Sequence, residues 1–458
     1  MVGPPALESR WDGSRERSGF PGTRFEKGGQ IIMTKDNPKY SAFISILQEE
    51  LVPAMGCTEP IALAYCAAKA REVLGTLPDR VVIGASGSII KNVKSVIVPN
   101  TDHMKGIPAA AAAGIVAGDP AKELEVIATV TPEQIAGMRE FLERTPITVE
   151  HVDNGLTFDI IVTLYKGEAY TKVRIVNYHT NIVLVEKNGD VLLEKAVDGE
   201  EEEGLTDRSC LNIADILDFA ESVDVNDIAE ILLRQIRYNT AIAEEGLRGN
   251  YGSNIGSILL QTYGDKSVMV RAKAMAAAGS DARMNGCELP VIINSGSGNQ
   301  GMTTSLPVIE YAKELQVSEE KLLRALAVAN LVTIHQKTSI GRLSAFCGAV
   351  SAGAGAGAGI AYLLGTDLDG ISHTVANAIA TTGGIVCDGA KASCASKIAT
   401  AVEAGILGYN MHIRNQNFQP DDGLVGDSPE ETIANIGRLG KQGMKSTNDE
   451  IIKIMVGE

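Results

Sequence analysis

Three cysteines in two segments offer the most specific chemistry in this sequence. Cys347 heads a run of Gly, Ala and Ser that ends at Gly359, and Cys387 and Cys394 lie seven residues apart in a second segment of small residues. Such small side chains let a backbone and a bulky inorganic group approach each other closely. Three thiolates from two segments suit an iron–sulfur cluster held by three cysteines. A [4Fe–4S] cluster bound in this way keeps one iron without a protein ligand, and that iron can act as a Lewis acid on a substrate.

Two other interpretations of these cysteines stay open. They could be buried residues that act only as small hydrophobic side chains. A zinc site would need a fourth ligand, and none stands nearby at the usual short spacing. The nearest histidine, His373, falls inside a predicted helix, where a histidine is more often a core or surface residue. Asp388 and Lys391, each beside one of the thiols, favour a functional site.

A fourth cysteine, Cys57, stands just before a predicted helix. Thr58 is a candidate N-cap for this helix, and Pro60 would lie in its first turn. The dipole and the free N–H groups at a helix N-terminus lower the pKa of a thiol. The position therefore favours a reactive thiolate at Cys57, although a lone cysteine is usually structural.

A loop of Gly, Ser, Asn and Gln follows a short apolar segment and covers residues 295–301. Its backbone N–H groups and amide side chains could bind an anion such as a carboxylate. The loop is not a Walker A motif, because no Gly-Lys-Ser/Thr follows. Three of its glycines have Gly-x-Gly-x-x-Gly spacing, but no alternating βαβ pattern supports a dinucleotide site.

The elements that would position these residues form two lobes of an α+β protein. The first lobe is expected to span 33–204 and to carry Cys57. In it, period-two segments separated by turn residues predict an antiparallel sheet, with Asn188-Gly189 as a hairpin turn. The predicted helices of this lobe are Pro38–Leu51, Ile61–Leu74, Ala109–Ala117 and Pro132–Arg144, and the predicted strands lie within 80–98, 123–131, 147–152, 156–165, 169–178 and 181–186.

The second lobe, 205–458, is expected to be mostly α-helical and to carry the iron–sulfur site. An acidic linker at 199–204 precedes it, and residues 1–32 are expected to be a disordered N-terminal extension. One or two amphipathic helices are expected within 428–456. The other predicted helices are Ile213–Val223, Asn226–Gly246, Ser267–Gly279, Leu306–Leu315, Ser318–Gln336, Ala345–Leu364, Gly370–Thr381 and Ala392–Tyr409.

Composition and charge narrow the class of protein. The 41 basic and 57 acidic residues give a net charge of −16, which argues against nucleic acid or an anionic membrane surface as a partner. The seven cysteines are an odd number, and no apolar signal segment precedes them, so reduced thiols are expected rather than disulfides. Ala345–Leu364 has no charge, but Gly and Ala partition weakly into lipid, so a buried helix is expected there. These features favour a cytoplasmic enzyme that acts on a small substrate.

The motifs together resemble those of the L-cysteine desulfidase family, which is related to the α-chain of iron–sulfur L-serine dehydratases. The resemblance rests on Met55-Gly-Cys-Thr-Glu-Pro60, Ser295-Gly-Ser-Gly-Asn-Gln-Gly301, Cys347-Gly-Ala and Cys387-Asp-Gly-Ala-Lys-Ala-Ser-Cys394, and it covers the chain from about Met33 onward. The dehydratases have a longer spacing between their last two ligands and a Pro-Val-Gly-Gly stretch after the Cys-Asp pair. The shorter spacing here favours the desulfidase branch without deciding the substrate.

The resemblance implies a [4Fe–4S] lyase that converts L-cysteine and water to pyruvate, ammonia and hydrogen sulfide. Cys347, Cys387 and Cys394 match the cluster ligands of the family, and Cys57 matches the cysteine that accepts the α-proton of the substrate. The candidates for contacts with the carboxylate and amino groups of the substrate are Ser295, Ser297, Asn299, Gln300 and Lys391.

Several alternatives stay open at this point. An L-serine or L-threonine deaminase could use the same cluster, because the open iron can serve a hydroxyl as well as a thiol leaving group. A non-catalytic redox or oxygen sensor would hold a cluster but would need no base at Cys57. Helix-rich enzymes of this size commonly pair, so a homodimer is a possible assembly.

Overall fold

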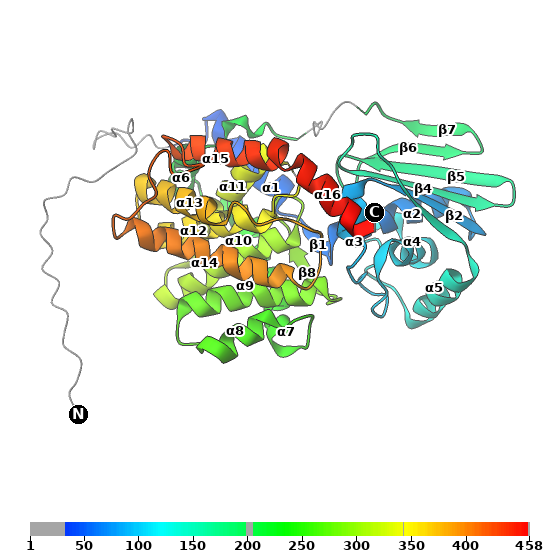
Figure 1. The fold of residues 1–458 in the computed structure, drawn as a ribbon, viewed down its shortest axis with the longest axis horizontal. Helices are drawn as coiled ribbons and strands as arrows, with labels where there is room; N and C mark the ends of the chain where they lie inside the picture. The colour runs from blue at the N-terminus through cyan, green and yellow to red at the C-terminus, as the bar shows by residue number, and fades with distance from the viewer. Residues whose placement is uncertain (1–32, 198–204, 342, 457–458) are drawn as a thin grey trace, which may run out of the picture.

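The computed structural model describes residues 33–197, 205–341 and 343–456. Two lobes lie side by side in it, a sheet-containing lobe and a larger helical lobe (Figure 1). This arrangement confirms the predicted α+β class, with the sheet in the N-terminal half and helices in the C-terminal half. The proposed extension at 1–32 and the acidic linker lie outside the described residues.

The sheet of the first lobe has six strands in the order β3-β2-β4-β5-β6-β7. All neighbouring strands are antiparallel except β2 and β3, which are parallel. Asn188 and Gly189, both with positive φ, form the predicted turn between β6 and β7. The strands are β2 (Arg80–Ala85), β3 (Ile147–His151), β4 (Asp159–Lys166), β5 (Ala169–Val176), β6 (Ile182–Lys187) and β7 (Asp190–Glu194).

Helices cover one face of this sheet and close its core (Figure 1). Helix α2 packs directly on β4 and β5, and α4 packs on α2. Gly114 of α4 allows this close approach, because a Cβ there would lie 2.0 Å from the carbonyl oxygen of Ala64. The helices of this lobe are α2 (Thr58–Leu74), α3 (Gly87–Val93), α4 (Gly106–Ala117) and α5 (Pro132–Arg144).

Two strand predictions in this lobe are wrong. Between residues 80 and 98 only β2 is a strand, and the following apolar run forms α3, which is buried on all sides. Periodicity cannot separate a buried helix from a buried strand in so short a run. Within 123–131, the structure has a 3₁₀ turn (Pro120–Glu125) instead, because Asp119 caps the N–H of Ala121 and Pro120 starts the turn.

The helical lobe surrounds α12, whose small residues let its neighbours approach closely. Most predicted helices are present, whereas α8 was not predicted and α10 begins eight residues earlier than predicted. The helices are α6 (Ile213–Ser222), α7 (Asn226–Arg248), α8 (Ile255–Tyr263), α9 (Val268–Met284), α10 (Gly298–Leu315), α11 (Glu319–Ile340), α12 (Gly348–Leu363), α13 (Leu368–Thr382), α14 (Cys394–His412), α15 (Pro429–Arg438) and α16 (Lys445–Val456).

Replacing Gly353 of α12 by alanine is expected to destabilise the protein by about 3 kcal/mol. The added Cβ would lie 2.3 Å from the carbonyl oxygen of Ala401 on α14, and a backbone atom cannot move aside cheaply. Denaturant unfolding measures the loss. Gly137→Ala in α5 is the matched control, because its Cβ would meet only Val116, at 3.4 Å. An equal loss in both variants would contradict the close-packing explanation.

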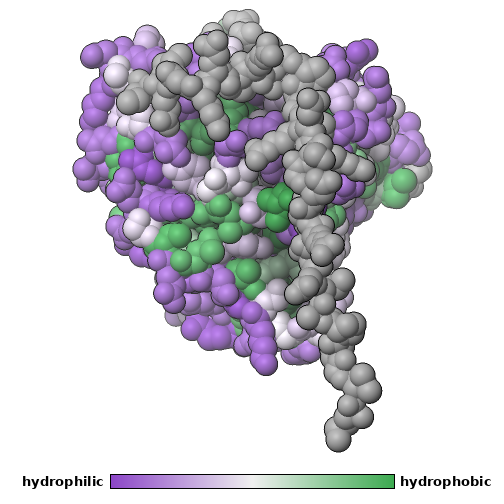
Figure 2. Space-filling model, turned by 90° about the vertical axis from the view of Figure 1, so that its left-hand side faces the viewer, coloured by the Kyte–Doolittle hydropathy of each residue, from purple (hydrophilic) through white to green (hydrophobic). Residues whose placement is uncertain are grey.

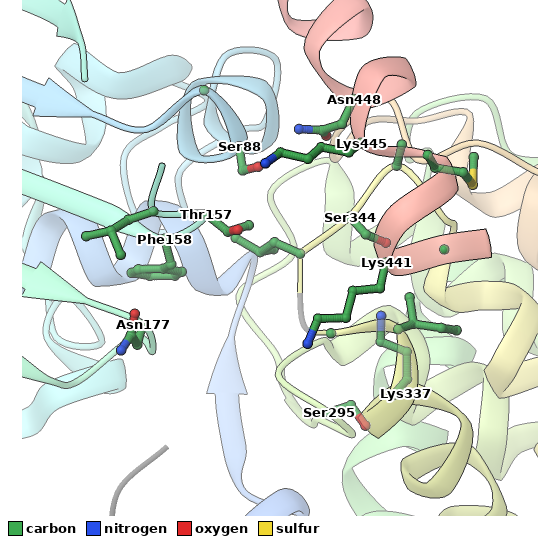
Figure 3. Close-up of a pocket in the computed structure, with 18 of the residues that line it drawn as sticks. Ser88, Thr157, Phe158, Asn177, Ser295, Lys337, Ser344, Lys441, Lys445 and Asn448 are labelled. Atoms are coloured by element: carbon green, nitrogen blue, oxygen red, sulfur yellow. The ribbon is translucent and has the colours of Figure 1, made fainter. Parts of the chain in front are cut away.

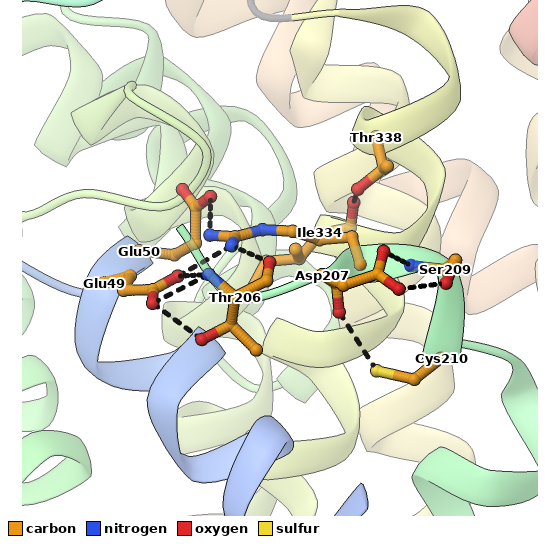
Figure 4. Close-up of polar contacts among 9 residues, drawn as sticks. Glu49, Glu50, Thr206, Asp207, Ser209, Cys210, Ile334 and Thr338 are labelled. Atoms are coloured by element: carbon orange, nitrogen blue, oxygen red, sulfur yellow. Dashed lines mark hydrogen bonds and ion pairs between the residues drawn. The ribbon is translucent and has the colours of Figure 1, made fainter. Parts of the chain in front are cut away.

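The ends of the chain cross between the lobes. Helix α1 (Pro38–Glu50) packs in the core of the helical lobe, although it precedes the sheet in sequence. Arg208 helps to hold it there, through ion pairs with Glu49 at 2.7 Å and Glu50 at 3.0 Å (Figure 4). At the other end, α16 returns to α3 of the first lobe. The predicted division near residue 204 falls within 198–204, outside the described residues.

The surface of the helical lobe is mixed in character. Figure 2 shows hydrophobic residues gathered in the middle of one face, with hydrophilic residues around them. Among the described residues, no helix is long and apolar enough to span a bilayer. All seven cysteines are free thiols, as predicted.

Candidate active site

Cys57 is held between the two lobes by a short strand pair. Strand β1 (Pro53–Met55) pairs with β8 (Pro290–Ile292), and Gly56 then turns the chain into α2 with φ of +56°. A side chain at Gly56 could not be accommodated, because its Cβ would lie 2.2 Å from Pro99. Cys57 is buried and is itself the N-cap residue of α2. Thr58, the predicted N-cap, is the first helical residue, and its hydroxyl donates to the carbonyl of Gly296 instead.

A buried carboxylate next to Cys57 was missed in the sequence. The thiol of Cys57 donates a hydrogen bond to Oε2 of Glu59 at 3.2 Å. The same carboxylate accepts a hydrogen bond from Thr58 at 3.1 Å and, at Oε1, one from Asn92 at 2.9 Å. Glu59 was visible in the motif, but only the fold shows that it turns back onto the thiol rather than toward solvent.

The expectation of a lowered thiol pKa at Cys57 is wrong for the protein without a bound cluster. Burial raises this pKa well above its ordinary value, and the negative charge of Glu59 raises it further. The nearby guanidinium of Arg283 acts in the opposite direction but is outweighed. The N-terminus of α2 cannot compensate for the removal of the thiol from water. Cys57 is therefore a protonated thiol with a carboxylate acceptor beside it.

Arg283 is a second residue that the sequence did not indicate. It lies near the end of α9 and is only 2% exposed. Its Nη1 donates to Oδ1 of Asn299 at 3.2 Å, while its Nε is buried and has no hydrogen-bond partner among the described residues. A buried guanidinium with donors to spare is suited to bind a carboxylate.

The predicted substrate loop divides between a turn and a helix. Ser295 has a positive φ and lies in a turn closed by Asn294 and Ser297. Ser297 is the N-cap residue of α10, so Asn299 and Gln300 belong to the first helical turn rather than to a loop. The helix starts this early because Gly301 lets it pack on β8, where a Cβ would lie 2.0 Å from the carbonyl of Ile292.

Gln300 connects this helix to the first of the three cluster-candidate cysteines. Its side chain packs against Gly348, where a Cβ would lie only 2.6 Å from the Gln300 amide carbon. Its Oε1 is buried and has no hydrogen-bond partner among the described residues. Since Gly348 directly follows Cys347, the amide of Gln300 lies close to that thiol.

The backbone brings Cys347 and Cys387 onto adjacent segments. The N–H of Cys347 donates to the carbonyl of Ile385 at 3.1 Å, and that of Cys387 donates to Ala345 at 2.6 Å. Cys347 is the N-cap residue of α12, and Cys394 is the first residue of α14. Burial, and then the neighbouring Cys387, raise the pKa of the Cys347 thiol to about 12. Cys394 raises it as well, so the three thiols lie in one group.

The segment between Cys387 and Cys394 is fixed by its own charges. Asp388 forms ion pairs with Lys391, at 2.5 Å, and with Lys397. Burial alone would raise the pKa of Asp388, but the hydrogen bonds from the two lysines outweigh it and lower this pKa to about 2. Lys391, predicted as a substrate contact, is thus engaged within the segment, and its contact with substrate stays a prediction.

Lys91 links the sheet-containing lobe to the same segment. It lies on α3, is only 1% exposed, and donates to the carbonyls of Ser344, at 3.4 Å, and Cys387, at 3.3 Å. It also donates to Asn448 of α16 at 2.7 Å. Burial lowers the pKa of this ammonium group. Gly389 packs over the Lys91 backbone, where a Cβ would lie 2.3 Å from its carbonyl oxygen.

Cys57 and Cys394 meet where the two lobes touch. Cys57 forms a small buried cluster with Val96 and Met284, and Cys394 and Ala390 pack against it. The first lobe thus contributes the thiol–carboxylate pair, and the second contributes the three-thiol group.

The three-thiol group is compatible with a cluster held by three cysteines. All three residues are only partly buried, and two of them begin helices. The segments carry glycine at 348 and 389, where no side chain would narrow the space beside the thiols. Lys391 and Lys397 add positive charge near thiolates that would be negative. The donor set therefore suits an iron–sulfur cluster.

A large cavity opens between the lobes on another side of this region. Its volume is about 1230 Å³, and Ser295 and Ser344 are among its lining residues. Figure 3 shows Lys337 and Lys441 near each other on one side, with Lys445 reaching toward Ser88. No cysteine among the described residues lines this cavity. Of the predicted substrate contacts, the structure thus separates Ser295 from Asn299 and Gln300.

Comparison with known proteins agrees with this arrangement. The serine dehydratase alpha chain family matches residues 121–453, which is more than half of the chain. The chain belongs to this family. Similar relatives are UPF0597 proteins from Desulfitobacterium hafniense, 58% identical over 93% of this chain and 99% of the relative, and from Treponema denticola, 46% identical over 93% and 100%. A third, from Lachnoclostridium phytofermentans, is 53% identical over 91% and 100%.

The family membership supports a serine dehydratase-like lyase of the iron–sulfur type. It confirms the wider relationship expected from the motifs, but not the narrower resemblance to cysteine desulfidases. The printed names of the relatives give no substrate.

Proposed function

We propose that this protein is a [4Fe–4S]-dependent lyase that converts L-cysteine and water to pyruvate, ammonia and hydrogen sulfide. The observation that carries the proposal is the thiol–carboxylate pair of Cys57 and Glu59, which lies against Cys394 of the three-thiol group. Cys347, Cys387 and Cys394 would hold the cluster. When bound, the cluster would supply an iron without a protein ligand, which polarises the bond to the leaving sulfur.

Proton abstraction falls to Cys57 in this proposal. Glu59 takes the proton of the thiol along their hydrogen bond, and the thiolate then removes the α-proton of the substrate. The electron pair of the broken C–H bond forms the Cα–Cβ double bond, and the β-substituent leaves as sulfide. The aminoacrylate product tautomerises to an imine, which water hydrolyses to pyruvate and ammonia.

Arg283 and Asn299 are the groups best placed to bind the substrate carboxylate. Their side chains contact each other at 3.2 Å, and Arg283 is close enough to Cys57 to influence its pKa. A guanidinium beside the carboxylate also makes the neighbouring α-proton more acidic, because it stabilises the negative charge that develops. Gln300 is proposed to contact the amino group, while Ser295, Ser297 and Lys391 stay as further candidates.

Replacing Arg283 by glutamine is expected to raise KM for the amino acid by about 10- to 100-fold, the usual worth of a charged hydrogen bond. Steady-state kinetics of pyruvate release measures it. The matched control is Arg271→Gln on the same helix, because Arg271 pairs with Glu314 and lies outside the site. Equal kinetics for the two variants would remove Arg283 from carboxylate binding.

A second candidate function is L-serine or L-threonine deamination on the same cluster. It is favoured by the family match, which names serine dehydratase. The same pair at Cys57 and Glu59 would remove the α-proton, and only the leaving group would differ. A third candidate, a redox or oxygen sensor, would leave the buried thiol–carboxylate pair without a purpose.

The test is an anaerobic assay after reconstitution with iron and sulfide, with L-cysteine, L-serine and L-threonine supplied separately. Faster pyruvate release from cysteine, with an equal amount of sulfide, is expected. Preference for serine or threonine would select the deaminase and would leave the site assignments intact. A cluster without turnover of any of the three would favour the sensor. Cysteine turnover in protein that carries no cluster would contradict the proposed mechanism.

The proposed setting is the cytoplasm, with a small amino acid as the ligand and without nucleic-acid or membrane partners. The net charge of −16 supports this, since an acidic protein is repelled by phosphate backbones and anionic lipids. A homodimer is part of the proposal, and the apolar area on the face in Figure 2 is available for it. Light scattering of the purified protein measures the mass of the assembly.

A further inference from the structure

A group of three potential metal ligands lies outside the proposed active site. Asp369 and His373 stand four residues apart on α13, so they share one face of that helix. His412 is the last residue of α14. Their ligand atoms all lie within 4.8 Å of one another. Two helices thus bring two imidazoles and a carboxylate to one place.

The spacing within the group fits a shared ion better than direct hydrogen bonding. Nε2 of His373 lies 3.7 Å from Oδ1 of Asp369, which is longer than an N–H···O hydrogen bond. Two ligands that each lie about 2.1 Å from one zinc ion are about 3 to 4 Å apart, depending on the angle at the ion. The rings of His373 and His412 stack with centroids 5.6 Å apart. The three side chains are therefore already gathered at a distance that an ion could bridge.

The surroundings keep this place ready for an ion. His373 is 3% exposed, and Nδ1 of His412 is buried with no hydrogen-bond partner among the described residues. Gly370 leaves room for the His412 ring, because a Cβ there would lie 2.8 Å from its Nε2. Burial lowers the pKa of His373, which favours the neutral imidazole that binds metals. The side chain of Asp369 is 41% exposed and offers a path from solvent.

We propose that Asp369, His373 and His412 form a structural site for a divalent transition-metal ion, zinc above all. Imidazole and carboxylate ligands suit such ions, and water would complete the coordination. The ion would join the start of α13 to the end of α14. Cys394 is the first residue of α14 and His412 its last, so this site lies about 27 Å from the three-thiol group and is separate from it.

The test measures zinc bound per chain after incubation with excess zinc and gel filtration, in the wild type, His412→Ala and Asp369→Asn. About one zinc ion per chain more is expected in the wild type than in either variant. Zinc should also raise the unfolding temperature of the wild type by about 2 °C or more, but not that of the variants. Asp369→Asn removes an exposed carboxylate, so it serves if His412→Ala fails to fold.

The matched control is His103→Ala, which removes an exposed histidine of the first lobe. It should bind as much zinc as the wild type. Zinc held by the cysteines would be the same in every variant, since none of them alters a thiol, so only the difference between variants counts. Equal zinc content in the wild type, His412→Ala and Asp369→Asn would overturn the proposal.

Discussion

Cys57→Ala is expected to keep the iron–sulfur absorption and to lose turnover by about a thousandfold, within the range that a general base contributes. Cys57 is buried with its thiol on Glu59, and it packs against Cys394 without belonging to the backbone-paired segments of Cys347 and Cys387. Removing its sulfur therefore takes away the proton acceptor and leaves the three-thiol group intact. Absorption spectra and pyruvate release after anaerobic reconstitution measure both properties on the same sample.

Glu59→Gln sharpens this experiment, because it keeps the shape of the side chain and removes its capacity to take the thiol proton. It should lower turnover by about a hundredfold or more, again with the cluster retained. Cys210→Ala is the control, since this partly buried thiol lies in a short 3₁₀ turn away from the site. Loss of the brown colour in Cys57→Ala would make Cys57 a ligand, and full turnover in that variant would end its proposed role.

Cys387→Ser is expected to lose the cluster and, with it, about a thousandfold or more in turnover. A serine hydroxyl is a much poorer ligand for iron than a thiolate, and two remaining thiols do not hold a cluster that needs three. The backbone hydrogen bond from residue 387 to Ala345 does not involve the side chain, so the local fold should survive. Iron and acid-labile sulfide per chain, measured after reconstitution, report the loss directly.

The matched control for this variant is Cys210→Ser, which should keep both the cluster and the activity. Circular dichroism of Cys387→Ser should match that of the wild type, because the large core of the helical lobe does not include Cys387. If Cys387→Ser retained full iron and sulfide, the ligand set would have to be sought among the other thiols.

Much of the architecture was predictable because it depends on local patterns. The alternating segments of the sheet, the Asn188-Gly189 turn and most helices of the second lobe follow from periodicity and turn chemistry. The errors occurred where burial is complete on all sides, as in α3, or where a glycine-rich run was interpreted as a loop. The first turn of α10 is helical because β8 packs against Gly301, which is a contact between elements and not a property of the run itself.

The sequence by itself determined the α+β division, the placing of Cys57 just before a helix and the group of three cysteines in small-residue segments. Only the tertiary structure decided what surrounds them, because burial and charge at a site come from distant residues. Arg283 on α9 and Lys91 on α3 reach the thiols from elements far away in the chain. Folding also reversed the expected pKa shift of Cys57, since removal from water outweighs the helix N-terminus.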